Sequence, residues 1–288
     1  MKNLKIIAIF LISGLTISSC STDDKTIDNV FDTVQRGAIL RTLNFNNTYN
    51  IFDVNDDTFK FELELEEQDA ENGNLLSEVK LYQSFVDNTD DGTDNSKPET
   101  LVKTIPKSDF GLSQNGLPLL DFSMKLSEAL TGSGLSDGEF FGGDVFRYRL
   151  DLVLTDGRVF TNVASGTVLG GSFFSSPFAY SVTVKCVPVT PFSGDYTLNL
   201  VDTYGDGWDG AFLTVNIDGT STDYTVDDGG SANFTVNVPD GTTTLEFSYT
   251  GGNFEEEHKY TIIGPFGVEA ASDGPSPNPG AIILNICN

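Results

Sequence analysis

The sequence has very little histidine, which removes one common kind of catalytic site. His258 is the only histidine among 288 residues, so a zinc site of the H-E-x-x-H type, which needs two histidines, cannot be built. A pair of carboxylates for glycoside hydrolysis needs only Asp or Glu, and the chain has 42 acidic residues, but no pair stands out from the others. We therefore expect no enzyme, with a glycoside hydrolase kept as a minor alternative.

Basic residues are also scarce. The chain has 16 Lys and Arg against 42 Asp and Glu, a formal net charge of −26. Residues 187–288 hold ten Asp and five Glu against one Lys, which gives 1 − 15 = −14. Such a surface repels phosphate backbones and attracts divalent cations, so nucleic acid is excluded as a partner.

The long apolar run of a membrane-spanning helix is missing as well. Residues 2–20 read KNLKIIAIFLISGLTISSC, with lysines first, then an apolar run over residues 6–15, then small residues. This pattern predicts a signal peptide over residues 1–19. A retained transmembrane helix is the alternative, but the run is shorter than the roughly 20 residues that a span needs.

The end of this segment, ISSC, resembles the lipobox of bacterial lipoproteins. The resemblance implies that Cys20 becomes the new N-terminus and carries the lipid. Residues 20–33 are polar and acidic, which favours a flexible tether. Asp23 and Asp24 resemble a signal for transport to the outer face of the outer membrane, although an ordinary solvated linker would look the same. The predicted location is the cell outer membrane, lipid-anchored and facing the extracellular side.

Cysteine is rare, and its count indicates an oxidising compartment. Once Cys20 is assigned to lipid, Cys186 and Cys287 remain as an even pair. We expect a disulfide between them. The alternative of two free buried thiols is less favoured in an exported chain, where nothing keeps thiols reduced.

From residue 34 onward the hydrophobic period is two, not 3.6. In TFKFELELEE, residues 59, 61, 63 and 65 are apolar and alternate with Lys or Glu, which is typical of a strand with one buried and one wet face. Asp156-Gly157 indicates a hairpin. Only LSEALTGSGL predicts a helix, capped by Ser127 and ended by Gly132. Seven or eight such strands predict an immunoglobulin- or fibronectin-like β-sandwich over residues 34–185.

After Cys186, short alternating segments are joined by DG, DGG, PDG and TGG turns. Six or more strands in about a hundred residues predict a second, smaller, disulfide-closed β-sandwich over residues 186–288. The fold class is thus all-β with two sandwich domains. Two acidic stretches in the first of them, residues 65–74 and 86–99, either hold a cation or form solvated turns, with Gly73 expected at a positive φ.

The stretch VDTYGDGWDG, residues 201–210, concentrates carboxylates, glycines and the only tryptophan. We expect it to join strands over 196–201 and 212–217 as a hairpin connection. It is not an EF-hand, because the third position is Tyr204 and strands flank it. Asp202, Asp206 and Asp209 either hold calcium, which takes roughly six to eight oxygen ligands, or accept backbone amides in a capped turn closed by Trp208.

This stretch resembles the D-x-Y-G-D-G-W-x-G modules of secreted and surface proteins of marine and environmental bacteria. The resemblance covers roughly residues 186–287. It implies a β-sandwich accessory module with Asp202, Tyr204, Asp206 and Trp208 on the motif positions, and no established activity. LEEQDAENG and SFVDN in the first domain resemble surface lipoproteins that accompany outer-membrane receptors of the starch-utilisation type, which implies a receptor complex as a partner.

Together these features predict a surface-anchored, non-enzymatic lipoprotein that binds or presents an extracellular ligand, in the first place a glycan, as an accessory to nutrient uptake. Tyr204 and Trp208 would stack on sugar rings beside the carboxylates. The alternative is a structural or adhesion protein made rigid by calcium. Burial of Trp208 would rule out stacking on that ring, so its exposure separates the two predictions.

Overall fold

The structure, a computed structural model, describes residues 36–89, 92–163, 169–171 and 173–287. Their regular structure is nearly all strand, which confirms the prediction of an all-β chain of β-sandwiches. No helix in these ranges is long and apolar enough to cross a membrane. The predicted signal peptide, Cys20 and the tether lie outside the described residues, as do Asp90 and Asp91.

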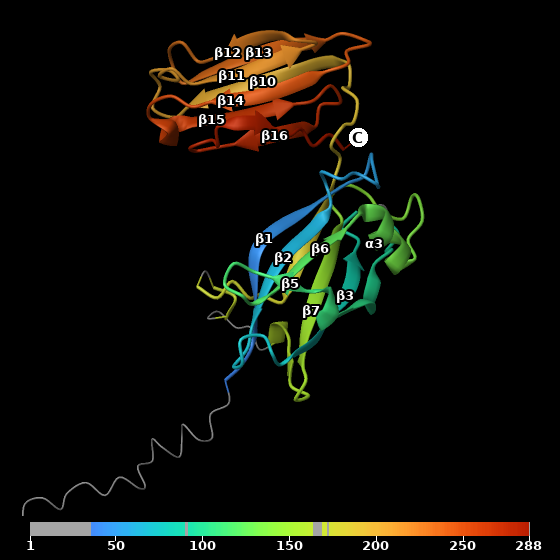
Figure 1. Cartoon of the computed structure of the whole chain (residues 1–288). Coiled ribbons are helices and arrows are strands. Elements are labelled where there is room, and N and C mark those ends of the chain that lie inside the picture. Colours follow the sequence, from blue (N-terminus) through green and yellow to red (C-terminus); the bar gives the residue numbers. More distant parts are fainter. Residues whose placement is uncertain (1–35, 90–91, 164–168, 172, 288) are drawn as a thin grey trace, which may run out of the picture. The chain divides into compact units, whose positions relative to one another are not determined.

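Strands β1–β9 form the first sandwich (Figure 1). They are β1 (Ile39–Asn50), β2 (Phe61–Gln68), β3 (Leu76–Val86), β4 (Lys97–Pro106), β5 (Gly111–Leu112), β6 (Pro118–Met124), β7 (Val145–Leu154), β8 (Val159–Phe160) and β9 (Ala179–Lys185). The strand order is β4-β3-β7-β9-β1-β2-β6-β5, with β8 beside β7. Strand β1 was not predicted from the sequence.

Strand β1 takes part in both layers of this sandwich. Residues 39–47 pair antiparallel with β2, and residues 48–50 pair parallel with β9. The alternating residues Phe61, Leu63 and Leu65 of β2 face the core, as their period of two predicts. Glu66, expected on the wet face, is instead buried, because Asn115 and Arg41 contact its carboxylate.

Two turns of the first sandwich confirm their sequence predictions. The Asp156-Gly157 turn joins β7 to β8 as an antiparallel hairpin, with Gly157 at φ +87°. Gly73 has a φ of +84°. Both positions suit glycine, which has no Cβ to clash in the left-handed region.

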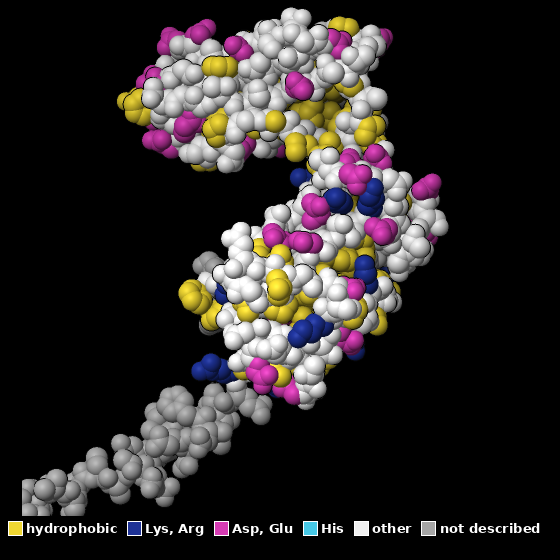
Figure 2. All heavy atoms as spheres, in the orientation of Figure 1, with side chains coloured by type: hydrophobic (Ala, Val, Ile, Leu, Met, Phe, Trp, Pro, Cys, Tyr) yellow, Lys and Arg dark blue, Asp and Glu magenta, His cyan; other side chains and the backbone are white. Residues whose placement is uncertain are grey.

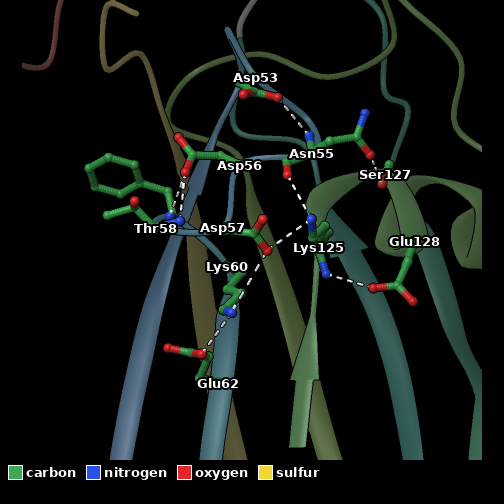
Figure 3. Close-up of polar contacts among 11 residues, drawn as sticks. Asp53, Asn55, Asp56, Asp57, Thr58, Lys60, Glu62, Lys125, Ser127 and Glu128 are labelled. Carbon is green, nitrogen blue, oxygen red and sulfur yellow. Dashed lines mark hydrogen bonds and ion pairs between the residues drawn. The ribbon is translucent and has the colours of Figure 1, made fainter.

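The α-helix α3 (Leu126–Ser133) differs from its prediction at both ends. Ser127 does not cap it, since its hydroxyl donates to the Asn55 side chain at 2.8 Å (Figure 3). The helix runs past Gly132 and ends at Ser133, with Gly134 as its C-cap at a φ of +65°. Lys125 bridges the loop between β1 and β2 to the helix start, with Nζ 2.9 Å from an Asp57 carboxylate oxygen.

Strands β10–β17 form the terminal sandwich, which has two four-stranded antiparallel sheets. They are β10 (Gly194–Asp202), β11 (Phe212–Ile217), β12 (Thr220–Tyr224), β13 (Ser231–Val238), β14 (Leu245–Thr250), β15 (His258–Ile263), β16 (Glu269–Asp273) and β17 (Gly280–Ile282). One sheet has the order β13-β10-β15-β16 and the other β12-β11-β14-β17. Strand β16 was not predicted from the sequence.

A disulfide confirms the predicted pairing of Cys186 with Cys287, whose Cα atoms are 5.1 Å apart. The carbonyl of Cys186 also accepts the backbone N–H of Ile286 at 2.8 Å, so a main-chain hydrogen bond joins the same two segments as the disulfide. On the face shown in Figure 2, acidic side chains are scattered over the terminal sandwich, while most Lys and Arg side chains lie on the first.

Candidate functional site

The stretch from Val201 to Gly210 does not form the predicted hairpin connection. Strand β10 belongs to one sheet of the terminal sandwich and β11 to the other. The loop over residues 203–211 therefore crosses from sheet to sheet and covers one end of the core. The prediction was wrong because two consecutive strands can pair with each other or lie in opposite layers, and alternation alone does not tell which.

Asp202, the last residue of β10, organises this loop through its carboxylate. Its oxygens accept the backbone N–H groups of Tyr204 at 2.9 Å, Asp206 at 3.0 Å and Gly207 at 2.6 Å. Burial alone would raise the pKa of Asp202, but these amides outweigh it and lower that pKa. The amide-capped turn, one of the two predicted ways to hold the charge at residue 202, is therefore present.

Gly207 and Trp208 turn the loop inward. Gly207 has a φ of +104°, and a Cβ there would come within 2.8 Å of the Val226 carbonyl oxygen, so only glycine fits. Trp208 follows it into the core, where its exposed fraction is 0%. Its indole N–H donates to the Val201 carbonyl at 3.0 Å, and its ring stacks on His258.

The burial of Trp208 corrects one prediction. A ring with no accessible surface cannot stack on a sugar, so Trp208 is a core residue and not a ligand-binding one. Tyr204, the other predicted aromatic contact, is 76% exposed. Phe254, in the neighbouring loop before β15, is 60% exposed and has a φ of +56°. The loops at this end of the sandwich thus present two aromatic rings to solvent.

Three carboxylates meet at the same end. Asp202, Asp206 and Glu257 each place an oxygen so that all three atoms lie within 4.8 Å of one another, the one such group of potential metal ligands among the described residues. Asp209, the third predicted ligand, is not in the group. Its backbone carbonyl instead accepts the N–H of Asn253 at 3.2 Å.

Glu257 joins the group because β15 pairs with β10. The antiparallel register sets Asp202 opposite His258, and the N–H of Thr203 donates to the Glu257 carbonyl at 2.9 Å. The run Glu255-Glu256-Glu257 was visible in the sequence. The sequence does not indicate that the strand after this run, β15, pairs with β10, because that pairing joins segments far apart in the chain.

The electrostatics of the group leave Glu257 uncompensated. Its pKa is raised, first by burial and then by the negative charges of Asp202 and Asp206. Within the described parts of the chain, neither the Asp206 nor the Glu257 carboxylate has a hydrogen-bond donor or an ion-pair partner. The capped turn therefore stabilises the charge of Asp202 and leaves the other two charges facing each other.

In the two acidic stretches of the first sandwich, residues 65–74 and 86–99, Asp side chains stabilise turns. Asp69 accepts three backbone N–H groups, and Asp87 accepts those of Thr89 and Asn95. Asp94 caps Ser96 in the same way. Asp69, Asp87 and Asp94 therefore serve as backbone acceptors in turns, the plainer of the two predicted roles.

Two features common in hydrolases have unsuitable surroundings here. His258 is fully buried between Trp208 and Tyr249, and its Nδ1 lies 3.1 Å from the Tyr249 hydroxyl. The pattern G-x-S-x-G occurs at residues 134–138, but it follows the end of helix α3, whereas a nucleophile elbow follows a strand and begins a helix. This Ser136 donates its backbone N–H to Glu139.

Comparison with known proteins adds little to these observations. No family model and no curated protein match the sequence. Among solved structures, a bacterial adhesin from Mobiluncus mulieris containing intramolecular disulfide, isopeptide and ester bond cross-links matches at 12% identity over 79% of each chain, with a TM-score of 0.19. A likeness at this level carries no argument about the present chain.

Proposed function

We propose that this chain is a non-enzymatic, lipid-anchored protein of the outer cell surface, whose terminal sandwich is a structural or adhesion module made rigid by calcium. The observation that carries the proposal is the group of Asp202, Asp206 and Glu257 oxygens within 4.8 Å of one another. The burial of Trp208 favours this class over a module that stacks ligands on its tryptophan.

Calcium suits these residues by its chemistry. It prefers carboxylate and carbonyl oxygens at about 2.3–2.6 Å, so two ligands of one ion lie no more than about 5 Å apart. The three oxygens already meet that limit. A bound cation would also remove the repulsion that raises the pKa of Glu257.

The mechanical effect would be to fasten two loops together. Backbone bonds from Thr203 to Glu257 and from Asn253 to Asp209 already join the loop over residues 203–211 to the segment over residues 251–257. Residues 206 and 257 belong to these two loops, so an ion held between them would resist their separation. A surface module that transmits force or meets proteases benefits from such a tie.

The anchored location rests on the sequence. The lipobox-like ISSC with Cys20 and the acidic residues after it support attachment to the outer membrane on its extracellular side. A receptor complex of the starch-utilisation type remains the proposed partner on the strength of the resemblance in the first domain.

Glycan binding is a second candidate, which the exposure of Tyr204 favours. An accessible aromatic ring beside carboxylates can stack on a sugar while the acids accept hydroxyl hydrogen bonds. A glycan array probed with the full-length protein, with and without calcium, tests this candidate, and Tyr204→Ala should lose any signal. Glycan binding that is unchanged in this variant would contradict a role of Tyr204 in it.

Thermal unfolding tests the calcium module. Calcium that binds only the folded state stabilises it by RT ln(1 + [L]/Kd), about 2.7 kcal/mol at a hundredfold excess over Kd. Metal-stripped wild-type protein should melt at a higher temperature after calcium is added, and chelator should reverse the change. Asp206→Asn should lose the response. Asp240→Asn is the matched control, since Asp240 is an exposed carboxylate of the same sandwich in the turn after β13.

A further inference from the structure

Glu67 is a carboxylate on the core face of a strand. In β2, residues 61, 63 and 65 point into the first sandwich, and Glu67 occupies the next inward position. Its exposed fraction is 0%. Glu66, on the opposite face, has the Asn115 amide 3.0 Å from its carboxylate. The two neighbours therefore differ in the polar contacts available to them.

Neither carboxylate oxygen of Glu67 has a hydrogen-bond partner in the described part of the chain. An ionised carboxylate that is buried without donors is strongly disfavoured, and such a group stays protonated instead. Burial is the largest cause that raises the pKa of Glu67, to about 8; the charge of Asp69 raises it further and Lys107 opposes both. The carboxyl is therefore mostly neutral at pH 7.

A tight turn over residues 69–75 lies against this carboxyl. The Asp69 side chain holds the turn by accepting the N–H groups of residues 71, 73 and 75 at 2.6, 2.9 and 2.8 Å. A Cβ at Gly73 would lie 3.2 Å from Glu67 Oε2 and 2.1 Å from a Pro118 carbon. Gly73 is thus the residue of the turn that lies against the Glu67 carboxyl, and it has no side chain.

The charged groups around Glu67 do not compensate an ionised form. Asp69 is negative, and its oxygens are committed to the turn. Lys107 is the nearby cation, but its Nζ donates to the carbonyls of Gly73 at 2.8 Å and Asn74 at 3.2 Å. Arg158 interacts with the charge of Asp69, and Arg41 with Glu66 on the outer face. Ionised Glu67 would need water, which the closed turn excludes.

We propose that Glu67 is a proton-dependent latch for the turn over residues 69–75: the turn stays closed over a neutral carboxyl and opens when that carboxyl ionises. The folded pKa lies above the ordinary value of 4.5, so the stabilising contribution is complete below about pH 4.5 and is lost as the pH rises through about 8. The free energy of unfolding of the first sandwich should therefore fall as the pH rises between about 4.5 and about 8.

The test compares the unfolding equilibrium of full-length wild type and Glu67→Gln by denaturant titration from pH 5 to 9. For one proton of difference, the unfolding constant of the wild type should increase by up to about tenfold per pH unit over about pH 5–8. Glu67→Gln should lack this increase, because its side chain is neutral throughout. Glu64→Gln, on the outward face of β2, should keep it. Equal slopes for wild type and Glu67→Gln would overturn the proposal.

A second measurement on the wild type tests the proposal if Glu67→Gln does not fold. The side-chain carboxyl carbon of Glu67 should titrate near pH 8 by nuclear magnetic resonance. The amide of Gly73 should be protected from hydrogen exchange below that pH and should lose its protection, approaching its intrinsic exchange rate, above it. Titration near 4.5, or protection of Gly73 that does not change with pH, would contradict the latch.

Discussion

The backbone N–H of Thr203 donates to the carbonyl oxygen of Glu257 at 2.9 Å, directly beside the paired strand ends of β10 and β15. This bond holds together a loop after one strand and a segment before another. The carboxylates of Asp206 and Glu257 meet at the same place, and Asp202 supplies the third. The candidate site is therefore a product of strand pairing and cannot be reduced to the DTYGDGWDG loop alone.

Asp202→Ala should destabilise the terminal sandwich even without calcium. The change removes the acceptor for three backbone N–H groups, of which that of Gly207 is buried. A buried donor left unpaired costs roughly 1–3 kcal/mol. Denaturant unfolding of metal-stripped protein measures the loss, and Asp206→Ala, whose carboxylate caps no amide, is the control. A stability equal to that of the wild type would show that the turn does not depend on this carboxylate.

The sequence was enough to predict the fold class, because alternation with a period of two is a local property. Residues 61, 63 and 65 face the core and the Asp156-Gly157 turn forms a hairpin, as the sequence predicts. Strand β1 was not singled out, since ILRTLNFNNTYN has three polar residues near its centre and joins two layers. Its pairing partners are set by the rest of the sandwich.

The candidate site was predicted only in part, for a related reason. Asp202 ends β10 and Asp206 follows four residues later in the next loop, so their proximity follows from the chain itself. Glu257 is distant in sequence, and its place depends on the register between β10 and β15. The burial of Trp208 likewise depends on the loop crossing between sheets, whereas a hairpin would have left the ring free to face solvent.

Removal of the disulfide should lower the free energy of unfolding without changing the strand order. Cys186 and Cys287 are 101 positions apart, and loss of a native disulfide typically costs about 2–5 kcal/mol. The double variant Cys186→Ala, Cys287→Ala should unfold at a lower denaturant concentration than the wild type. Intact-mass analysis of alkylated wild type should show neither cysteine modified before reduction. Free, alkylated thiols at these positions would refute the bridge.

Asp218 provides a pH test in the terminal sandwich. Its carboxylate accepts from the Thr243 hydroxyl at 2.8 Å and the Thr244 N–H at 2.8 Å, and the Thr243 bond is the main cause that lowers the pKa of Asp218. A lowered folded pKa gives stability that is present above the ordinary value of 3.8 and is lost as the pH falls through the folded value. In Asp218→Asn, the melting temperature should therefore fall less steeply with decreasing pH below about pH 4 than it does in the wild type. The same pH dependence of the melting temperature in the variant and the wild type would contradict this role of Asp218.

The anchor prediction concerns Cys20. Cys20→Ala should move the protein from the membrane fraction to the soluble fraction, because no other residue in ISSC can carry the thioether-linked lipid. Protease treatment of intact cells then reports which face of the membrane the wild type occupies. A Cys20→Ala variant that still fractionates with the outer membrane would contradict the lipoprotein assignment.

Calorimetric titration of calcium into metal-stripped, full-length protein tests the central claim most directly. We expect one calcium site per chain, with an affinity no weaker than about 1 mM, the weak end for extracellular calcium modules. Glu257→Gln should abolish binding and Asp240→Asn should retain it, since Asp240 lies at the opposite end of β10 from the three carboxylates. Absence of calcium binding by the wild type, or binding that Glu257→Gln leaves unchanged, would contradict the account.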